Sequence, residues 1–93
     1  MSYTILLEPQ AVDDLRVIYR FITQNDSPQK AKNFLDHLKE KINAIGYMPY
    51  KYRKSFYHEE ESIRDMIYKG YTVVYKISGT TIHVLTVFRQ KNY

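Results

Sequence analysis

The sequence contains no cysteine, which excludes a disulfide framework, a thiolate nucleophile and a zinc site built on cysteine. No apolar run approaches the roughly 20 residues that a membrane-spanning helix needs, so we expect no membrane partner. The N-terminal stretch MSYTILLEPQ has no basic region and no small-residue cleavage site, so we expect no signal peptide. These absences agree with a cytoplasmic protein.

The common catalytic motifs are also absent. There is no G-x-S-x-G, P-loop, G-x-G-x-x-G or H-E-x-x-H sequence. The histidines His37, His58 and His83 lack metal-ligand spacing, and the acidic run Glu59–Glu61 is typical of a solvated turn. We therefore predict no metal and no cofactor.

What the chain does contain is a modest core and a basic surface. Its 93 residues, 44% of them hydrophobic, predict one domain over residues 1–93. The net charge of +4 favours a polyanion or an acidic protein as partner, although an ordinary basic surface explains it equally well. Ten tyrosines without a tryptophan suit both a core and a recognition surface.

Two helices are predicted in the first half of the chain. Apolar residues recur at helical spacing from Pro9 to Gln24, and we assign the aspartates of this segment to favourable charge near the helix N-terminus. Ser27 is a plausible N-cap for a second helix that starts at Pro28, and Gly46 is the expected C-terminal cap. The short link predicts an antiparallel helical hairpin.

Strand patterns flank this hairpin. They are residues 2–8, 54–58 (KSFYH), 62–69, 71–77 and 81–89, with a polar turn at 59–62. Short turns between the last runs predict an antiparallel meander. The predicted fold is α+β with two layers: an N-terminal strand and a helical hairpin on one face of a twisted antiparallel sheet, in the order β-α-α-β-β-β-β. We expect Val74, Leu85 and Val87 on the opposite, half-apolar and half-basic face, which is typical of a binding surface.

Basic and aromatic residues alternate between Tyr47 and His58. Lys51, Arg53 and Lys54 lie among rings that include Tyr57, a pattern that suits stacking on bases and pairing with phosphates of single-stranded nucleic acid. The alternative is a tyrosine-rich loop that closes the edge of the core.

Further cations occur in the predicted strands and at the end of the sequence. Arg64 either faces solvent, braces backbone carbonyls or takes part in function. Arg89, Lys91 and Tyr93 follow the last strand. An arginine can stabilise charge that builds on a phosphate, and a tyrosine can stack on a base or transfer a proton.

Taken in order, these stretches resemble the RelE/ParE superfamily, the toxins of bacterial type II toxin–antitoxin pairs. The matching stretches are AVDDLRVIYRFI, SPQKAKNFLDHLKEKINAIGYMP, SIRDMIYKGYTVVYKI and TIHVLTVFRQKNY. They cover nearly the whole chain, and their order and length carry the resemblance. It implies two helices on a curved antiparallel sheet, an interior last strand, and a neutralising antitoxin as partner.

The resemblance implies one of two activities. RelE-like members cleave messenger RNA on the ribosome with arginines and lysines of the sheet and a C-terminal tyrosine or histidine, whereas ParE-like members poison DNA gyrase. Arg89 and Tyr93 stand where the RelE-like C-terminal pair is expected, while Arg64 matches an arginine common to both branches. The usual place of the RelE-like strand arginine is near Ile67 here.

We therefore predict a growth-inhibiting toxin and favour a metal-independent, ribosome-dependent mRNA endoribonuclease. Its predicted catalytic residues are Arg64, Arg89 and Tyr93, and its predicted target-binding residues are Lys51, Arg53, Lys54, Tyr57 and Lys91. The alternatives are a ParE-like gyrase inhibitor and a non-catalytic, degenerate toxin that only binds its antitoxin.

Overall fold

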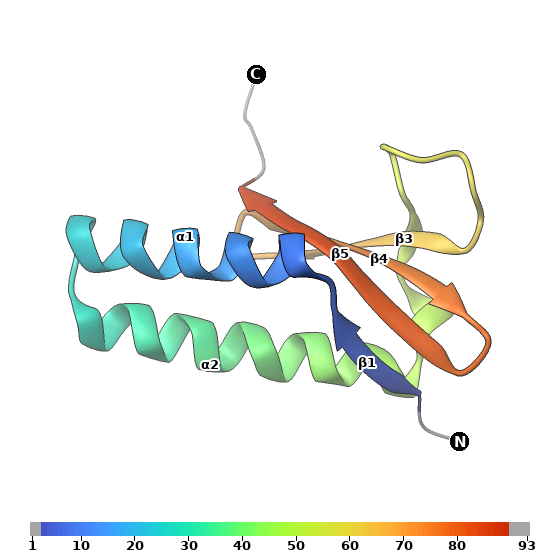
Figure 1. Cartoon of the computed structure of the whole chain (residues 1–93), viewed down its shortest axis with the longest axis horizontal. Helices are drawn as coiled ribbons and strands as arrows, with labels where there is room; N and C mark the ends of the chain where they lie inside the picture. The colour runs from blue at the N-terminus through green and yellow to red at the C-terminus, as the bar shows by residue number, and fades with distance from the viewer. Residues whose placement is uncertain (1–2, 90–93) are drawn as a thin grey trace.

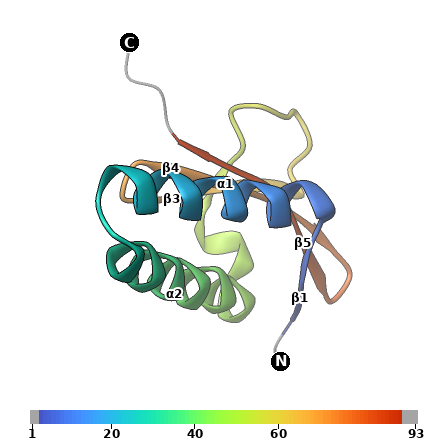
Figure 2. The ribbon, with the colours of Figure 1, turned by 60° about the vertical axis from the view of Figure 1, so that its left-hand side comes forward.

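The chain folds into a helical hairpin that covers one face of a sheet (Figures 1 and 2). The computed structural model describes residues 3–89, so the predicted site residues Lys91 and Tyr93 lie outside the described part. Within that part the order is β1 (Thr4–Leu7), α1 (Pro9–Asn25), α2 (Pro28–Ala44), the 3₁₀ turns η1 (Ile45–Tyr47) and η2 (Pro49–Lys51), β2 (Arg53–Lys54), β3 (Ile63–Tyr68), β4 (Tyr71–Ser78) and β5 (Thr81–Arg89). The predicted α+β class and the element order are confirmed.

The helix boundaries follow from local chemistry. Pro9 and Pro28 occupy the first turns of α1 and α2, where a missing backbone N–H costs nothing. The Ser27 hydroxyl accepts a hydrogen bond from the N–H of Lys30 at 3.2 Å, as its predicted N-cap role requires. The prediction for Gly46 is wrong, because α2 passes at Ile45 directly into η1 without a left-handed residue.

The five strands of the described chain have the order β1-β5-β4-β3-β2. β5 lies between β1 and β4, which is the interior position that we expected. The pairs from β2 to β5 are antiparallel, but β1 runs parallel to β5 with Thr4 opposite Thr81 and Val84 opposite Leu7. The sheet is therefore mixed and not wholly antiparallel. The helical hairpin separates β1 from the meander, so β1 is not bound to the alternating direction of the strands that short turns connect.

Side chains from both helices and from one face of β3, β4 and β5 form the core. Its buried members are Ala11, Leu15, Ile18, Leu35, Leu38, Ile42, Ile45, Met66, Tyr71, Val73, Tyr75, Ile77, Ile82, Val84 and Val87. Tyr75 and Val73 on β4 have no exposed surface, and neither have Ile82 and Val84 on β5, so the core lies beneath these two strands.

An irregularity in β5 changes which residues reach this core. Val74 pairs with Thr86 but Tyr75 pairs with Val84, so Leu85 is an extra residue on β5. The bulge turns Val87 toward the helices, and Val74 is only 1% exposed on the other face. The prediction is therefore wrong for Val87, which faces the helices, whereas Val74 lies on the predicted face but is buried there.

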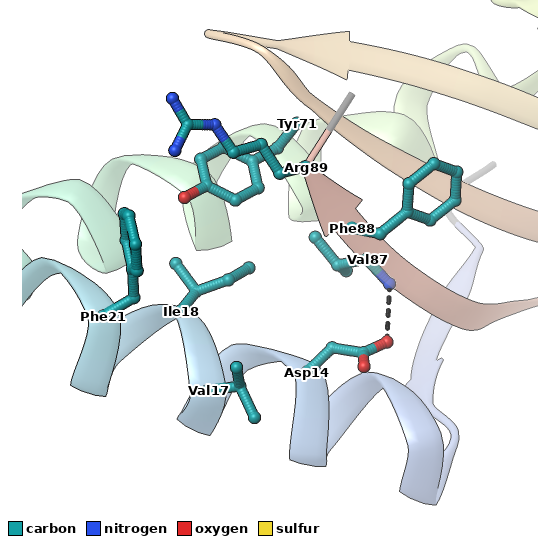
Figure 3. Close-up of a pocket in the computed structure, with 8 residues that line it drawn as sticks. All are labelled: Asp14, Val17, Ile18, Phe21, Tyr71, Val87, Phe88 and Arg89. Carbon is teal, nitrogen blue, oxygen red and sulfur yellow. Dashed lines mark hydrogen bonds between the residues drawn. The ribbon is translucent and has the colours of Figure 1, made fainter. Parts of the chain in front are cut away.

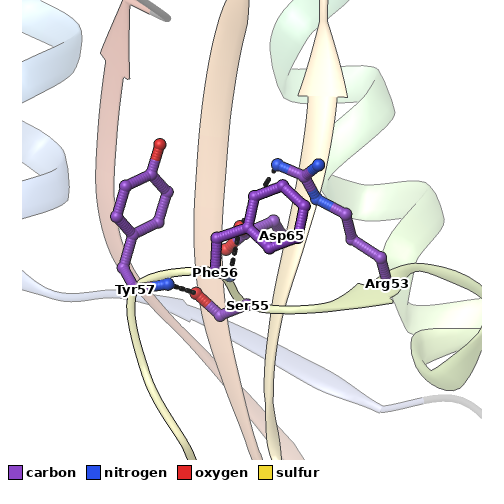
Figure 4. Close-up of polar contacts among 5 residues, drawn as sticks. All are labelled: Arg53, Ser55, Phe56, Tyr57 and Asp65. Atoms are coloured by element: carbon purple, nitrogen blue, oxygen red, sulfur yellow. Dashed lines mark hydrogen bonds and ion pairs between the residues drawn. The ribbon is translucent and has the colours of Figure 1, made fainter.

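The predicted strand at 54–58 is also wrong beyond Lys54. The N–H of Phe56 bonds to the Asp65 carboxylate at 3.2 Å, and the N–H of Tyr57 bonds to the Ser55 hydroxyl at 3.1 Å. Side chains thus take the backbone donors that a strand would offer to its neighbour, so the segment leaves the sheet and crosses its open face (Figure 4).

Candidate functional site

Arg64 on β3 holds the connection between α2 and the sheet. Its Nε donates to the carbonyl of Glu61 at 2.8 Å, and its Nη1 donates to the carbonyls of Tyr52 and Tyr50 at 3.0 and 3.3 Å. The guanidinium also lies 5.1 Å from the ring centroid of Tyr50. This is a backbone-bracing geometry, and it occupies donors that a substrate phosphate would need.

Arg89 ends β5 at the rim of a groove between that strand and α1. The groove has a volume of about 300 Å³ and is lined mainly by apolar side chains, including Val17, Phe21, Val87 and Phe88. Figure 3 shows the two sets of side chains facing one another, with Arg89 above Tyr71. The guanidinium lies 5.6 Å from the ring centroid of Phe21. We call this feature the α1–β5 groove.

Arg64 and Arg89 lie far apart on the sheet. Arg64 is opposite Tyr75 and Arg89 is opposite Tyr71, so the two are offset by four residues, roughly 13 Å along β4, and lie on strands to either side of it. Directly opposed residues point to the same face, and both tyrosines belong to the core beneath the helices. Both arginines therefore project on the helix side.

The basic and aromatic residues near β2 form a different surface. Arg53 is opposite Asp65, and its guanidinium lies 3.8 Å from the ring centroid of Phe56 and 3.5 Å from the Asp65 carboxylate. Tyr57 packs edge-on against Phe88, with the ring centroids 5.3 Å apart. Figure 4 shows both rings lying over the strands on the open face of the sheet.

The other two predicted cations flank this surface. Lys54 lies opposite Arg64, and Lys51 ends η2 with its ammonium 5.4 Å from the ring of Tyr52. The described members of the predicted site are thus divided between the helix side and the open face. They do not meet in one cavity.

Comparison with known proteins decides the family. The model of the ParE toxin of type II toxin–antitoxin systems matches residues 5–92. The chain belongs to this family of toxins. No curated protein matches it in sequence.

Solved structures share its fold at low identity. The chromosomal ParDE system from P. aeruginosa gives a TM-score of 0.82 at 16% identity, over 97% of this chain and 98% of that one. The toxin–antitoxin complex RelBE2 from Mycobacterium tuberculosis gives 0.73 at 18% identity, over 99% and 95%. A mutant of the E. coli toxin RelE in the free state gives 0.67 at 15% identity, over 96% and 84%.

The structural roles of three polar residues of this ParE-family chain were not found by the sequence reasoning. The aspartate Asp14 bonds to β5, and Asp65 is buried on the open face with a side chain that has no exposed area. The hydroxyl of Tyr75 donates to the carbonyl of Pro49, and burial raises the pKa of that hydroxyl well above its ordinary value. The available signal was an aspartate inside an apolar strand, IRDMI, which is unusual unless the carboxylate has a partner.

Two further findings limit what the site offers. Among residues 3–89, no three acidic or histidine side chains gather into a group that could hold a metal ion. In the same part of the chain, neither helix is both long enough and apolar enough to cross a membrane.

Proposed function

We propose that this protein is a growth-inhibiting toxin that acts by binding its target and not by cutting RNA, with DNA gyrase as the target. The observation that carries the proposal is the separation of Arg64 from Arg89, together with the bracing role of Arg64. The match to the ParE toxin model over residues 5–92 supports the same choice.

Catalytic demands argue against the nuclease that the sequence favoured. Cleavage of a phosphodiester requires a charge-stabilising donor and an acid or base placed together at the reacting atoms. Arg64 already serves three carbonyls, and the one oxygen of Asp14 that approaches β5 in the α1–β5 groove accepts hydrogen bonds from Thr86 and Val87. Among residues 3–89, no second cation of the predicted set lies beside Arg89.

A neutralising antitoxin is the expected second partner, and the α1–β5 groove is a suitable place for it. Among the described residues that line it, the groove offers an apolar floor and a single exposed cation, Arg89, at its rim. An amphipathic or extended antitoxin segment with an acidic residue opposite Arg89 would complement both features. The predicted cations Arg53 and Lys54 on the other edge of the sheet offer a second point of charge contact.

The deciding experiment has a cellular and a biochemical part. Inducing the chain alone in bacteria should arrest growth, and co-expression of the protein encoded beside it should restore growth. Purified protein should inhibit supercoiling by gyrase and should leave mRNA on translating ribosomes without new 5′ ends. New 5′ ends with normal supercoiling would instead establish the ribosome-dependent nuclease. Normal growth despite soluble expression would establish the non-catalytic module.

A further inference from the structure

Three large side chains with apolar surface are exposed where the chain passes from α2 to the sheet. Tyr47, Met48 and Tyr50 are 79%, 62% and 56% exposed. We call the segment that carries them, residues 47–51, the 47–51 turn. Exposed apolar side chains are common singly, but a local group of three is typical of a surface that a partner covers.

The backbone of this turn is held in place by side chains of β3 and β4. The hydroxyl of Tyr75 donates to the carbonyl of Pro49, and Pro49 itself is buried. The guanidinium of Arg64 donates to the carbonyl of Tyr50 at 3.3 Å, and a backbone hydrogen bond of 3.1 Å closes η2. The exposed side chains therefore extend from a fixed backbone, which lowers the entropy that binding a partner costs.

The positive charge of the protein is concentrated around the turn. Of the 14 lysine and arginine residues, four lie within residues 41–58, a stretch that contains no acidic residue. The other ten are balanced by the ten acidic residues of the rest of the chain, so this stretch accounts for the net charge of +4. Lys51 lies in the turn itself and is exposed. A partner that complements this surface is therefore acidic.

The 47–51 turn lies away from the α1–β5 groove. Tyr75, which bonds to the turn, is four residues along β4 from Tyr71, which lines the groove, and this separation is roughly 13 Å. None of the described residues that line the groove belongs to the turn. A partner at the turn and a partner at the groove thus contact separate surfaces of the protein.

We propose that the 47–51 turn is the surface through which this toxin docks on its protein target, at an acidic site that receives Tyr47 and Met48. The inference rests on the proposed function, in which the target is gyrase. Tyrosine and methionine are enriched in protein interfaces, and methionine adapts to irregular apolar pockets. Nucleic acid fits less well, because methionine has no ring to stack on a base and the guanidinium of Arg64 lies 5.1 Å from the ring centroid of Tyr50.

The first test measures inhibition of supercoiling by purified gyrase. The double variant Tyr47→Ala/Met48→Ala should raise the toxin concentration that gives half inhibition by about tenfold or more. Its stability in urea and its affinity for the antitoxin should stay at the wild-type level, because both side chains are exposed. Tyr19→Ala removes an exposed tyrosine ring from α1 and should leave the inhibition unchanged. Wild-type inhibition by the double variant would overturn the docking surface.

The second test concerns the charge of the partner. Lys51→Glu should raise the half-inhibiting concentration by about three- to tenfold, because the new carboxylate faces an acidic site. Lys69→Glu makes the same change at an exposed lysine between β3 and β4 and should have little effect. Equal effects of the two reversals would overturn the acidic site. Plasmid DNA binding, measured by mobility shift without gyrase, should be the same for all variants; a parallel loss would assign the turn to nucleic acid and overturn the proposal.

Growth arrest separates a failure of this inference from a failure of the proposed function. If the wild type arrests growth without inhibiting supercoiling, gyrase is not the target, and the double variant decides the role of the turn. Lost arrest with normal antitoxin binding would support docking on a different target, whereas undiminished arrest would overturn the docking surface. A wild type that does not arrest growth would overturn it too, since the toxin then has no target.

Discussion

The carboxylate of Asp14 on α1 accepts a hydrogen bond from the backbone N–H of Val87 on β5, at 2.9 Å and 73 positions along the chain. The same oxygen accepts from the hydroxyl of Thr86 at 2.6 Å. β1 pairs with β5 only as far as Val84, so Asp14 satisfies a strand donor beyond the end of β1. Asp14 thus links α1 to β5 by hydrogen bonds. It is not a first-turn charge, since α1 has no acidic residue in its first turn.

Replacing Asp14 should therefore destabilise the fold. Asp14→Ala leaves the N–H of Val87 and the hydroxyl of Thr86 without their acceptor, and we expect a loss of about 2–3 kcal/mol in the free energy of unfolding. Asp13→Ala is the matched control, because Asp13 is exposed and its one ion pair within residues 3–89 is with Arg16 at 3.5 Å. Its effect should stay within about 0.5 kcal/mol. Urea denaturation measures the loss for both variants. Equal losses would contradict the role of Asp14 as a link between helix and sheet.

Arg64 should behave as a brace. Arg64→Ala removes the donors from three carbonyls, so we expect a loss of about 2 kcal/mol in the free energy of unfolding. Arg64→Lys should recover only part of the lost stability, because the ammonium of lysine cannot reproduce the planar arrangement of guanidinium donors. Two quantities are measured for each variant: the free energy of unfolding, and the inhibition of supercoiling per folded molecule. Lost inhibition at unchanged stability would show instead that Arg64 contacts the target.

Local pattern was sufficient for the helices and the meander, and insufficient where distant side chains decide. Ser27 and Pro28 signal the start of α2 in the sequence itself. The strand predicted at KSFYH fails for a different reason. The Asp65 carboxylate, nine positions from Phe56, accepts the backbone N–H of Phe56 that a strand would donate to its neighbour. The bulge at Leu85 reverses the alternation of β5, and periodicity alone contains no sign of it.

The candidate site was predictable in composition and not in arrangement. Arg53, Lys54 and Tyr57 were named from the sequence as a basic and aromatic group, and in the structure all three are exposed in or next to β2. Arg89 was predicted to act in catalysis together with Arg64, but the register places it at the α1–β5 groove, away from Arg64. Which face a strand residue points to depends on pairing, and pairing is a property of the whole sheet.

Tyr75 should make the stability of the fold decrease at alkaline pH. Burial raises the pKa of its hydroxyl, so the protonated form stabilises the fold fully below the unfolded pKa of about 10, and this contribution is lost as the pH rises above that value. Tyr75→Phe should cost about 1 kcal/mol at neutral pH, because the carbonyl of Pro49 loses its donor. Its disadvantage should shrink above about pH 10. Tyr47→Phe, at a ring that is 79% exposed, should change neither quantity. Parallel pH curves for wild type and Tyr75→Phe would exclude the mechanism.

Arg89 provides the sharpest test of the two proposed partners. If the antitoxin places an acidic residue at the α1–β5 groove, Arg89→Ala should slow association by about three- to tenfold at low salt and weaken its dependence on ionic strength. Lys41→Ala removes the same charge from the last turn of α2, outside this groove, and should affect the rate little.

The same variant separates binding from cleavage. In the gyrase-inhibitor proposal, Arg89→Ala changes the potency against supercoiling and mRNA stays intact with either protein. In a nuclease, loss of a charge-stabilising arginine would lower the cleavage rate on the order of 100-fold to 1,000-fold while the fold remains. Kinetic measurements with antitoxin and primer extension on ribosome-bound mRNA report the two quantities independently. A cation at the rim acts mainly by steering the encounter of the two proteins. If the association rate does not change with ionic strength, the electrostatic part of the antitoxin proposal is therefore wrong.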